Sequence, residues 1–246
     1  MKSFLKKITP RTIKVKRREY ITKYNNHKLK WKVIKYLEKE LKNNQSVEKL
    51  EIINFLKHNP LSVFPYKYTK EYNPKDIPVY MDSDCNMKYV LQDNKRLYFK
   101  RGWDDEQIKK YYNGLLIEQD IDSPHRYEVG DFCVQENDIV VDVGVAEGNF
   151  SLSVVEKAKK SYLFEVDEEW IDVLKITFAP WKEKVVIVNK YVSDTNNNNC
   201  VKLDNFLKKE KLNFLKADIE GAELQLLKGA KTLLSTQHSI KIAICT

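Results

Sequence analysis

The sequence has 246 residues, of which 42% are hydrophobic and 11% aromatic, with seven glycines and seven prolines. This composition supports a buried core and excludes a collagen-like chain or a flexible linker protein. The net charge of +8 is uneven: residues 1–42 carry 15 Lys and Arg against three acids, and the remainder carries 28 basic and 32 acidic residues. The basic segment is typical of a solvated arm, and it could also favour anionic glycans, nucleotide sugars, membrane surfaces or nucleic acid.

The first third of the chain is predicted to be mainly helical. Residues 1–26 are basic and show no hydrophobic period, so an irregular arm is expected there. Apolar residues then recur at helical spacing over residues 29–41, and Trp31, Tyr36 and Leu37 are expected in the core of that helix. Ser46 is a predicted N-cap for a second helix, which ends before Pro60.

A β-hairpin and a further helix are predicted next. Short β-type runs at residues 87–90 and 96–99 flank a predicted turn at residues 92–95. Asp104 is expected to cap a helix that extends to about residue 119. Residues 27–122 are therefore predicted to form a helical N-terminal region that contains a hairpin.

From residue 123 onward the pattern is typical of an α/β domain. Strands are predicted at residues 139–143, 162–166, 185–188, 214–217 and 240–244, and helices at residues 149–159, 170–178 and 223–234. The first strand is almost continuously apolar, as expected for a parallel strand that is buried on both faces. Strands that alternate with helices indicate a doubly wound sheet in residues 123–246.

Polar residues and glycines gather where these strands end, which is where open α/β sheets bind ligands. Gly144 and Gly148 allow a sharp turn with close backbone approach, and the amides that follow can receive an anion. Glu165, at the end of the second strand, can accept hydrogen bonds from both hydroxyls of a ribose. These features predict an adenosine-containing cofactor, although Glu165 could instead cap the following helix.

The spacing of the loop glycines and the charge of the predicted crevice indicate which cofactor binds there. A dinucleotide site needs G-x-G-x-x-G, but this loop has G-x-x-x-G, and the nucleotide-triphosphatase pattern G-x-x-x-x-G-K-[ST] is absent. Such a crevice would gather six carboxylates, which oppose a pyrophosphate and tolerate a sulfonium cation. These are Asp142, Glu147, Glu165, Asp167, Asp218 and Glu220. The residues therefore predict S-adenosylmethionine.

A family resemblance supports this interpretation. The segments are VVDVGVAEGNF (residues 140–150), YLFE (162–165), LKADIEGAE (215–223) and LKGA (227–230). Together they resemble the FkbM family of methyltransferases, over roughly residues 125–246. The resemblance implies a class I methyltransferase (Rossmann-like) fold with strand order 3-2-1-4-5-7-6, and methyl transfer to a hydroxyl, often on a sugar or polyketide. Two departures are Ala146, where the family's loop often has a third glycine, and a predicted sheet that lacks the last two strands.

The candidate site residues follow from these positions. Asp218 or Glu220 is the candidate base, with His125 as the next candidate, although Asp218 and Glu220 could be first-turn acids of the next helix. Ser193 and Asp194 are expected on the adenine side of the site, or could simply cap a turn. The predicted cofactor-binding residues are Asp142, Gly144, Ala146, Gly148, Asn149, Phe150, Glu165, Val166, Ser193, Asp194 and Asp218.

The function predicted from the sequence is S-adenosylmethionine-dependent O-methylation of a sugar or other hydroxyl acceptor. A methyltransferase-fold binding module with little or no catalysis is the alternative, and an NAD-dependent oxidoreductase is disfavoured by the loop spacing. A homodimer is a predicted assembly, formed through the edge of the fifth strand or through the N-terminal region. No nucleic-acid partner is expected.

Cysteine usage and hydropathy bear on the compartment. Four cysteines lie far apart without a C-x-x-C pair, so no metal site is predicted, and scattered thiols suit a reducing compartment. The N-terminal lysines have no apolar segment typical of a secretory signal, and no apolar run approaches the ~20 residues that span a bilayer. We therefore expect a cytoplasmic protein.

Overall fold

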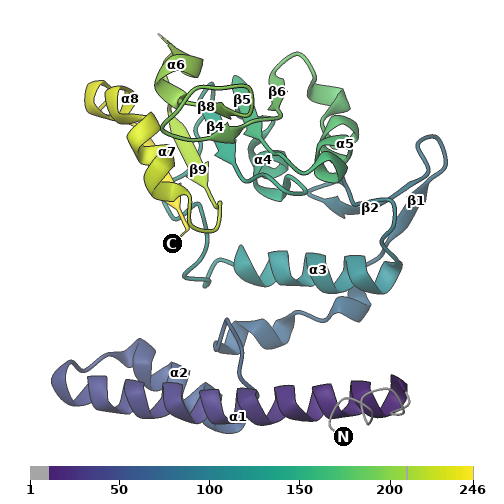
Figure 1. Ribbon diagram of the computed structural model, residues 1–246, viewed down its shortest axis with the longest axis vertical. Helices are drawn as coiled ribbons and strands as arrows, with labels where there is room; N and C mark the ends of the chain where they lie inside the picture. The colour runs from purple at the N-terminus through teal and green to yellow at the C-terminus, as the bar shows by residue number, and fades with distance from the viewer. Residues whose placement is uncertain (1–10, 209, 246) are drawn as a thin grey trace, which may run out of the picture. The chain divides into compact units, whose positions relative to one another are not determined.

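The computed structural model describes residues 11–208 and 210–245. The chain divides into two compact units, with the division between Glu71 and Tyr72. Figure 1 labels most of the helices and strands of both units along the chain.

The N-terminal unit is a pair of helices followed by a short 3₁₀ turn. Its elements are α1 (Arg11–Asn43), α2 (Val47–His58) and η1 (Lys67–Glu71). Ser46 caps α2 as predicted, since its hydroxyl oxygen accepts the Lys49 N–H at 3.3 Å. Ile34 of α1 packs with Ile53 and Leu56 of α2 in a small hydrophobic core.

The prediction of an irregular arm is wrong for residues 11–26, which form the first half of α1. Residues 11–43 contain no Gly or Pro and many lysines, so intrinsic propensity supports a helix there even without a hydrophobic period. Residues 1–10 of the expected arm lie outside the described residues. The buried face also differs from the expected one, because Ile34 is 1% exposed whereas Trp31 and Tyr36 are 40% and 62% exposed.

The second unit begins with a small antiparallel sheet and a helix. Its first elements are η2 (Pro74–Asp76), β1 (Tyr80–Asp82), β2 (Met87–Gln92), β3 (Lys95–Tyr98) and α3 (Asp105–Glu118). The predicted hairpin is confirmed, and Asp93 and Asn94 take φ of 50° and 62° in its two-residue turn. Asp104 and Gln107 form a capping box at the start of α3. Strand β1 was not predicted.

The hairpin and α3 share one hydrophobic core with the α/β part of the chain. Leu97 of β3 and Ile108 of α3 belong to the same buried cluster as Leu163 of the parallel sheet and Leu174 of α5 (Glu168–Thr177). The structure therefore divides after Glu71 rather than near residue 123. This packing joins residues far apart in sequence, so local periodicity carries no sign of it.

The centre of the second unit is a five-stranded parallel sheet. Its strands are β4 (Ile139–Val143), β5 (Lys160–Phe164), β6 (Val185–Val188), β9 (Phe214–Ala217) and β10 (Lys241–Ile244). Their spatial order is β10-β9-β4-β5-β6, which is the order 5-4-1-2-3 expected for a class I methyltransferase sheet. Val141 of β4 lies between Tyr162 of β5 and Leu215 of β9. The predicted α/β doubly wound class is confirmed.

Helices cover both faces of this sheet (Figure 1). The remaining elements are α4 (Asn149–Val154), η3 (Ala179–Trp181), β7 (Tyr191–Val192), β8 (Cys200–Val201), α6 (Leu203–Leu207), α7 (Glu223–Gly229) and α8 (Lys231–Thr236). Along β5, Leu163 belongs to the cluster with α3 and α5, whereas Tyr162 and Phe164 belong to the cluster with α6, α7 and α8. The single helix predicted at residues 223–234 is divided at Ala230. Within the described residues, no helix is both long and apolar enough to cross a bilayer.

Candidate cofactor-binding site

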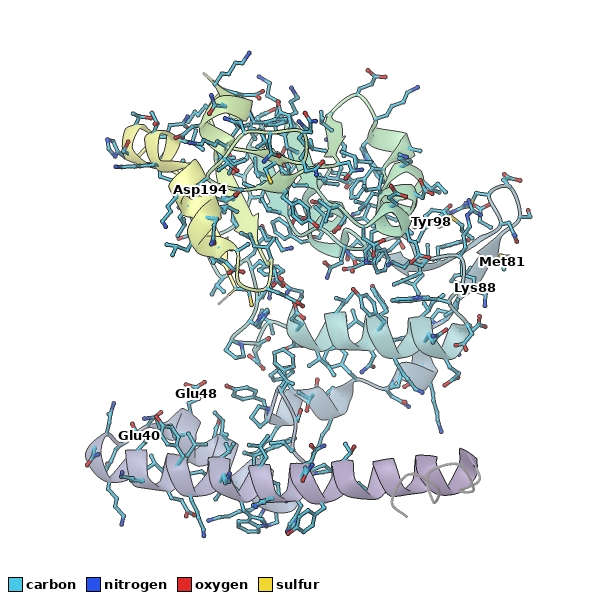
Figure 2. The ribbon with its side chains drawn as sticks, in the orientation of Figure 1. Glu40, Glu48, Met81, Lys88, Tyr98 and Asp194 are labelled. Carbon is cyan, nitrogen blue, oxygen red and sulfur yellow. The ribbon has the colours of Figure 1, made fainter. Side chains whose placement is uncertain are left out.

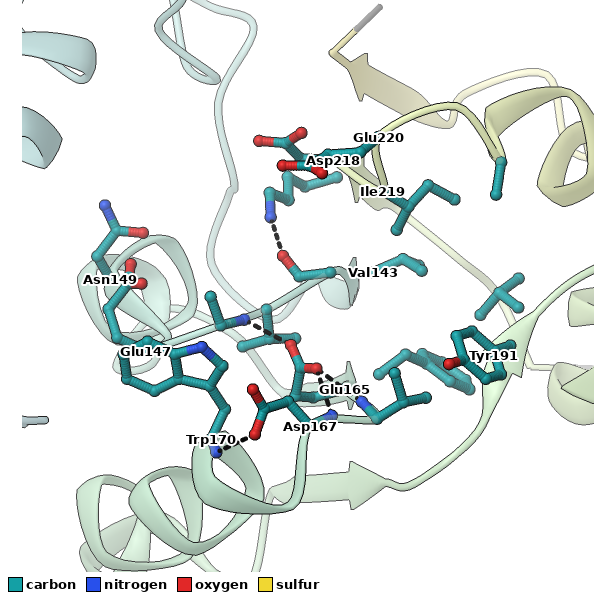
Figure 3. Close-up of a pocket in the computed structure, with 18 of the residues that line it drawn as sticks. Val143, Glu147, Asn149, Glu165, Asp167, Trp170, Tyr191, Asp218, Ile219 and Glu220 are labelled. Atoms are coloured by element: carbon teal, nitrogen blue, oxygen red, sulfur yellow. Dashed lines mark hydrogen bonds between the residues drawn. The ribbon is translucent and has the colours of Figure 1, made fainter. Parts of the chain in front are cut away.

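A cavity of about 570 Å³ opens at the carboxyl ends of β4, β5 and β9. Figure 3 shows it with its main side chains. Its walls come from the loop after β4, the start of α5, the segment that precedes α7, and helix α3. The residues that line it include Tyr111, Glu118, Tyr127, Gly144, Ala146, Glu147, Asn149, Glu165, Val166, Asp167, Lys190, Tyr191, Val192, Lys216, Asp218 and Glu220.

The two glycines after β4 are required by the backbone and by close packing. Gly144 has a φ of +73°, and a Cβ built on it would lie 1.9 Å from the backbone oxygen of Asp218. Gly148 has a φ of +89°, and its Cβ would lie 2.8 Å from the Leu174 side chain. The close approach predicted for these glycines is therefore made to the protein's own backbone and core, and Gly148 does not line the cavity.

Ala146 takes a left-handed φ of 50° in this loop, a conformation that costs a non-glycine residue roughly 1–2 kcal/mol. We expect Ala146→Gly to raise the free energy of unfolding by about 0.5–1 kcal/mol, because part of that strain is offset by the greater chain entropy of glycine. Urea unfolding measures the change. Ala179→Gly is the control, because Ala179 is exposed in η3 and its φ is not left-handed, so that substitution should destabilise. Equal destabilisation by both variants would contradict the strain at Ala146.

Glu165 is held at the end of β5 by three backbone N–H groups (Figure 3). Its Oε2 accepts from Ala146 at 2.8 Å, and its Oε1 accepts from Val166 at 2.7 Å and from Asp167 at 2.9 Å. The alternative role as helix cap belongs to Asp167, whose Oδ1 accepts the N–H groups of Glu169 and Trp170. The Glu165 carboxylate is thus fixed on the wall of the cavity.

Asp142 does not reach the cavity. It is 1% exposed, its Oδ1 lies 3.0 Å from the Lys216 ammonium, and its Oδ2 accepts from the Ser151 hydroxyl at 2.7 Å. Burial raises the pKa of the Asp142 carboxyl, and the Lys216 charge opposes that rise. Lys216 also donates to the Gly144 carbonyl at 2.7 Å, so the Asp142–Lys216 pair anchors the start of the loop after β4.

Helix α3 contacts the loop after β4 through a hydrogen bond to a buried carboxylate. The Tyr111 hydroxyl donates to Glu147 Oε2 at 2.6 Å, and Glu147 is 2% exposed. Burial raises the pKa of Glu147, and the hydrogen bond from Tyr111 opposes the rise. Glu147 therefore joins the glycine loop to α3.

Two of the three candidate bases lie in the cavity wall. Asp218 Oδ2 accepts from the Tyr127 hydroxyl at 2.9 Å, and Glu220 is exposed beside it with a φ of 50° (Figure 3). Burial, followed by the charge of Asp218, raises the pKa of the Tyr127 hydroxyl, so this group remains a proton donor. The first-turn acid of α7 is Glu223, which accepts the Gly221 N–H at 2.9 Å. Asp218 and Glu220 are therefore not the first-turn acids of that helix.

His125 lies outside the cavity lining. Its Nε2 is 2.9 Å from Cys245 Sγ, and its Nδ1 is 3.4 Å from an oxygen of Glu118. Glu118 does line the cavity. The structure thus separates His125 from Asp218 and Glu220 and connects it to the site through Glu118.

Ser193 and Asp194, which the sequence predicts on the adenine side, do not line the cavity. The residues just before them, Lys190, Tyr191 and Val192, do line it. A Cβ on Gly229 would lie 1.9 Å from the Ser193 oxygen, so the end of α7 packs directly on this loop, and Figure 2 labels Asp194 beside α7. The glycine of the LKGA segment is thereby explained as a packing requirement.

Of the other residues predicted to bind the cofactor, some line the cavity and one is buried away from it. Asn149 and Val166 line the cavity, but Phe150 is buried among Tyr127 and Phe214. Within residues 11–208 and 210–245, no group of three His, Cys, Asp or Glu side chains could hold a metal ion.

Sequence reasoning missed Tyr111, Glu118, Tyr127 and Lys216 in the cavity wall. Tyr111 lies three residues after the buried Ile108 and so on the apolar side of α3, where a tyrosine hydroxyl indicates a buried polar partner. Lys216 interrupts an otherwise apolar strand, and a lysine in such a strand calls for a buried partner.

Comparison with known proteins identifies the family. A family model described as "Methyltransferase FkbM domain" matches residues 109–245, more than half of the chain. The chain belongs to the FkbM methyltransferase family. The part of the chain that matches the FkbM model includes every residue named above as lining the cavity.

Solved structures also resemble this FkbM-family chain. The crystal structure of methyltransferase FkbM from Methylobacillus flagellatus KT is 18% identical with a TM-score of 0.43, over 57% of this chain and 42% of that one. An rRNA methylase from Streptococcus thermophilus is 20% identical with a TM-score of 0.34, over 44% of this chain and 61% of that one. A Streptococcus mutans protein solved in complex with SAH is 18% identical with a TM-score of 0.33, over 44% and 63%. The chain spans less than two thirds of each of these proteins, and no curated protein matches it.

Proposed function

We propose that this chain binds S-adenosylmethionine in the cavity at the strand ends and methylates a hydroxyl group of an acceptor such as a sugar. The observation that carries the proposal is Glu165, an anchored carboxylate at the end of the second strand of a class I methyltransferase sheet. A carboxylate at this position can accept hydrogen bonds from two adjacent ribose hydroxyls.

The charge of the cavity wall fits a cationic cofactor. The named lining residues include six carboxylates and two lysines. Lys216 is already paired with Asp142, and Asp167 is paired with Lys100, so Glu118, Glu165, Asp218 and Glu220 face Lys190. This balance opposes the two negative charges of a pyrophosphate and favours a sulfonium. It supports S-adenosylmethionine over the NAD-type cofactor that the loop spacing already disfavours.

Each of three residues in the cavity wall has a proposed role in methyl transfer. When bound, S-adenosylmethionine supplies an electrophilic methyl group, and the chain must hold the acceptor hydroxyl in line with it and accept its proton. Asp218 is the proposed acceptor of that proton. Tyr127 positions Asp218 by donating to one of its oxygens, and Glu220 is the second candidate on the same turn.

Replacing Glu165 by Ala tests the cofactor site. We expect S-adenosylmethionine binding to weaken by about 1–3 kcal/mol, the scale for losing a hydrogen bond to a charged group, as measured by titration calorimetry. Glu168→Ala is the matched control, because Glu168 lies three residues further on, is exposed, and does not line the cavity. Unchanged affinity in the Glu165 variant would remove this residue from the site.

A second assay separates an enzyme from a binding module of the same fold. Labelled S-adenosylmethionine is incubated with a panel of sugar acceptors, and the formation of S-adenosylhomocysteine is followed. Acceptor-dependent turnover supports the methyltransferase. Cofactor binding without turnover on any hydroxyl acceptor would favour the binding module.

A further inference from the structure

One face of α1 carries a line of lysines. Lys28, Lys32, Lys35, Lys39 and Lys42 follow each other at intervals of four, three, four and three residues, and all five are exposed. Side chains at these intervals lie on one side of an α-helix, about 21 Å from first to last at 1.5 Å per residue.

The opposite face of α1 is the one that packs within the unit. Ile34 is buried against α2, and Leu37 and Leu41 are half-buried around it. At 100° per residue these three positions lie roughly opposite the lysine line, so the line points away from α2. The lysines are therefore not part of the core of this unit.

The charges of the line are not compensated within the described part of the chain. The neighbouring acids Glu38 and Glu40 lie to the sides of the line and pair with Lys57 and Lys49 of α2, at 2.8 and 3.8 Å. Among the side chains described, those of residues 22–208 and 210–245, no ion pair of 4.0 Å or less involves any of the five lysines. Five like charges in a row raise the local positive potential and attract an extended anionic surface.

Exposed apolar side chains border the line on both sides. Tyr24 and Trp31 lie along one border at 60% and 40% exposure, and Leu29 and Tyr36 lie along the other at 49% and 62% exposure. Tryptophan and tyrosine are the side chains that settle at the interface between lipid headgroups and hydrocarbon, while lysines reach the headgroups.

We propose that the lysine line of α1 and its aromatic borders bind the surface of a lipid bilayer that contains anionic lipids. The helix would lie along the surface rather than cross it, since its lysine face is charged. The aromatic borders favour a bilayer over duplex nucleic acid, since tryptophan and tyrosine settle at the headgroup interface, whereas a duplex offers phosphates to the lysines alone. The surface is independent of the proposed methyl transfer, because none of its residues lines the cavity.

Vesicle flotation with the full chain tests the proposal. We expect the protein to float with vesicles of phosphatidylcholine plus about 30% phosphatidylglycerol and not with phosphatidylcholine alone, and binding should fall as salt screens the lysines. Replacing the five lysines of the line by Gln should lower binding by about tenfold or more. The matched control replaces five exposed, unpaired lysines of the second unit by Gln: Lys157, Lys159, Lys182, Lys211 and Lys231.

Both five-lysine variants should remain folded. Circular dichroism melting of both variants should match the unaltered chain, because none of the ten lysines is buried. Trp31→Phe should also weaken vesicle binding if the aromatic border enters the interface. Equal binding of the two five-lysine variants would overturn the proposal. So would equal flotation with neutral and anionic vesicles, or lysine-dependent binding of duplex DNA or RNA without any binding of vesicles.

Discussion

Asp218→Asn is expected to lower methyl-transfer turnover by about 100-fold or more while leaving the affinity for S-adenosylmethionine nearly unchanged. An amide cannot accept the proton of the acceptor hydroxyl, and a general base typically contributes about 10²–10⁴-fold. The asparagine oxygen can still accept from the Tyr127 hydroxyl, so the geometry of the turn should persist. Turnover is measured as S-adenosylhomocysteine formation at saturating cofactor, and affinity by calorimetry.

Glu220→Gln is the natural companion to this variant, because Glu220 lies two residues away on the same cavity wall. We expect a smaller loss there, since Glu220 is exposed to solvent. If Asp218→Asn keeps full turnover and Glu220→Gln loses it, the two roles are exchanged. If both amides keep full turnover, the proton leaves by another route, and the Glu118 carboxylate with its neighbour His125 becomes the next group to test.

Gly144→Ala should reduce the free energy of unfolding by about 3 kcal/mol or more. The substitution places a Cβ 1.9 Å from the Asp218 backbone oxygen and forces alanine into a φ of +73°. Backbone strain of this kind costs roughly 1–3 kcal/mol by itself, and the clash requires β4 and β9 to separate where their ends meet the cavity. Urea unfolding measures the loss, and thermal melting serves if the variant is too unstable for a folded baseline.

Gly114→Ala gives the matched control on α3. A Cβ at Gly114 meets no heavy atom within 4 Å, and the residue is in a helix, so this substitution should stabilise by about 0.5–1 kcal/mol. Opposite signs for the two glycines would confirm that close approach governs position 144. A Gly144 variant as stable as the unaltered chain would show that the loop can move away from Asp218.

The parallel sheet could be predicted because its strands are short apolar runs between turn residues. β4, β6 and β9 have the predicted bounds, and Asp104 begins α3 as its sequence indicated. Glu165 was also placed at a strand end from spacing alone. These features depend on neighbouring residues in the chain, and local sequence carries that information.

The rest depends on contacts between distant segments. Asp142 was expected in the cofactor site, but its carboxylate turns toward Lys216, which arrives on β9. Tyr111 and Tyr127 enter the cavity wall because α3 and the segment after it pack against the sheet, and no local pattern specified that packing. The helix over residues 11–26 was not predicted because that segment has no hydrophobic stripe. Its helix propensity alone supports the helix.

The three backbone N–H groups that bind Glu165 determine the stage at which its side chain loses rotamer freedom. A glutamate free in solution samples many rotamers, and fixing such a side chain on ligand binding costs roughly 0.5–1.5 kcal/mol. Here the amides of Ala146, Val166 and Asp167 already fix it in the folded chain. That entropy is therefore given up during folding, so the Glu165 carboxylate lines the cavity as a rigid group.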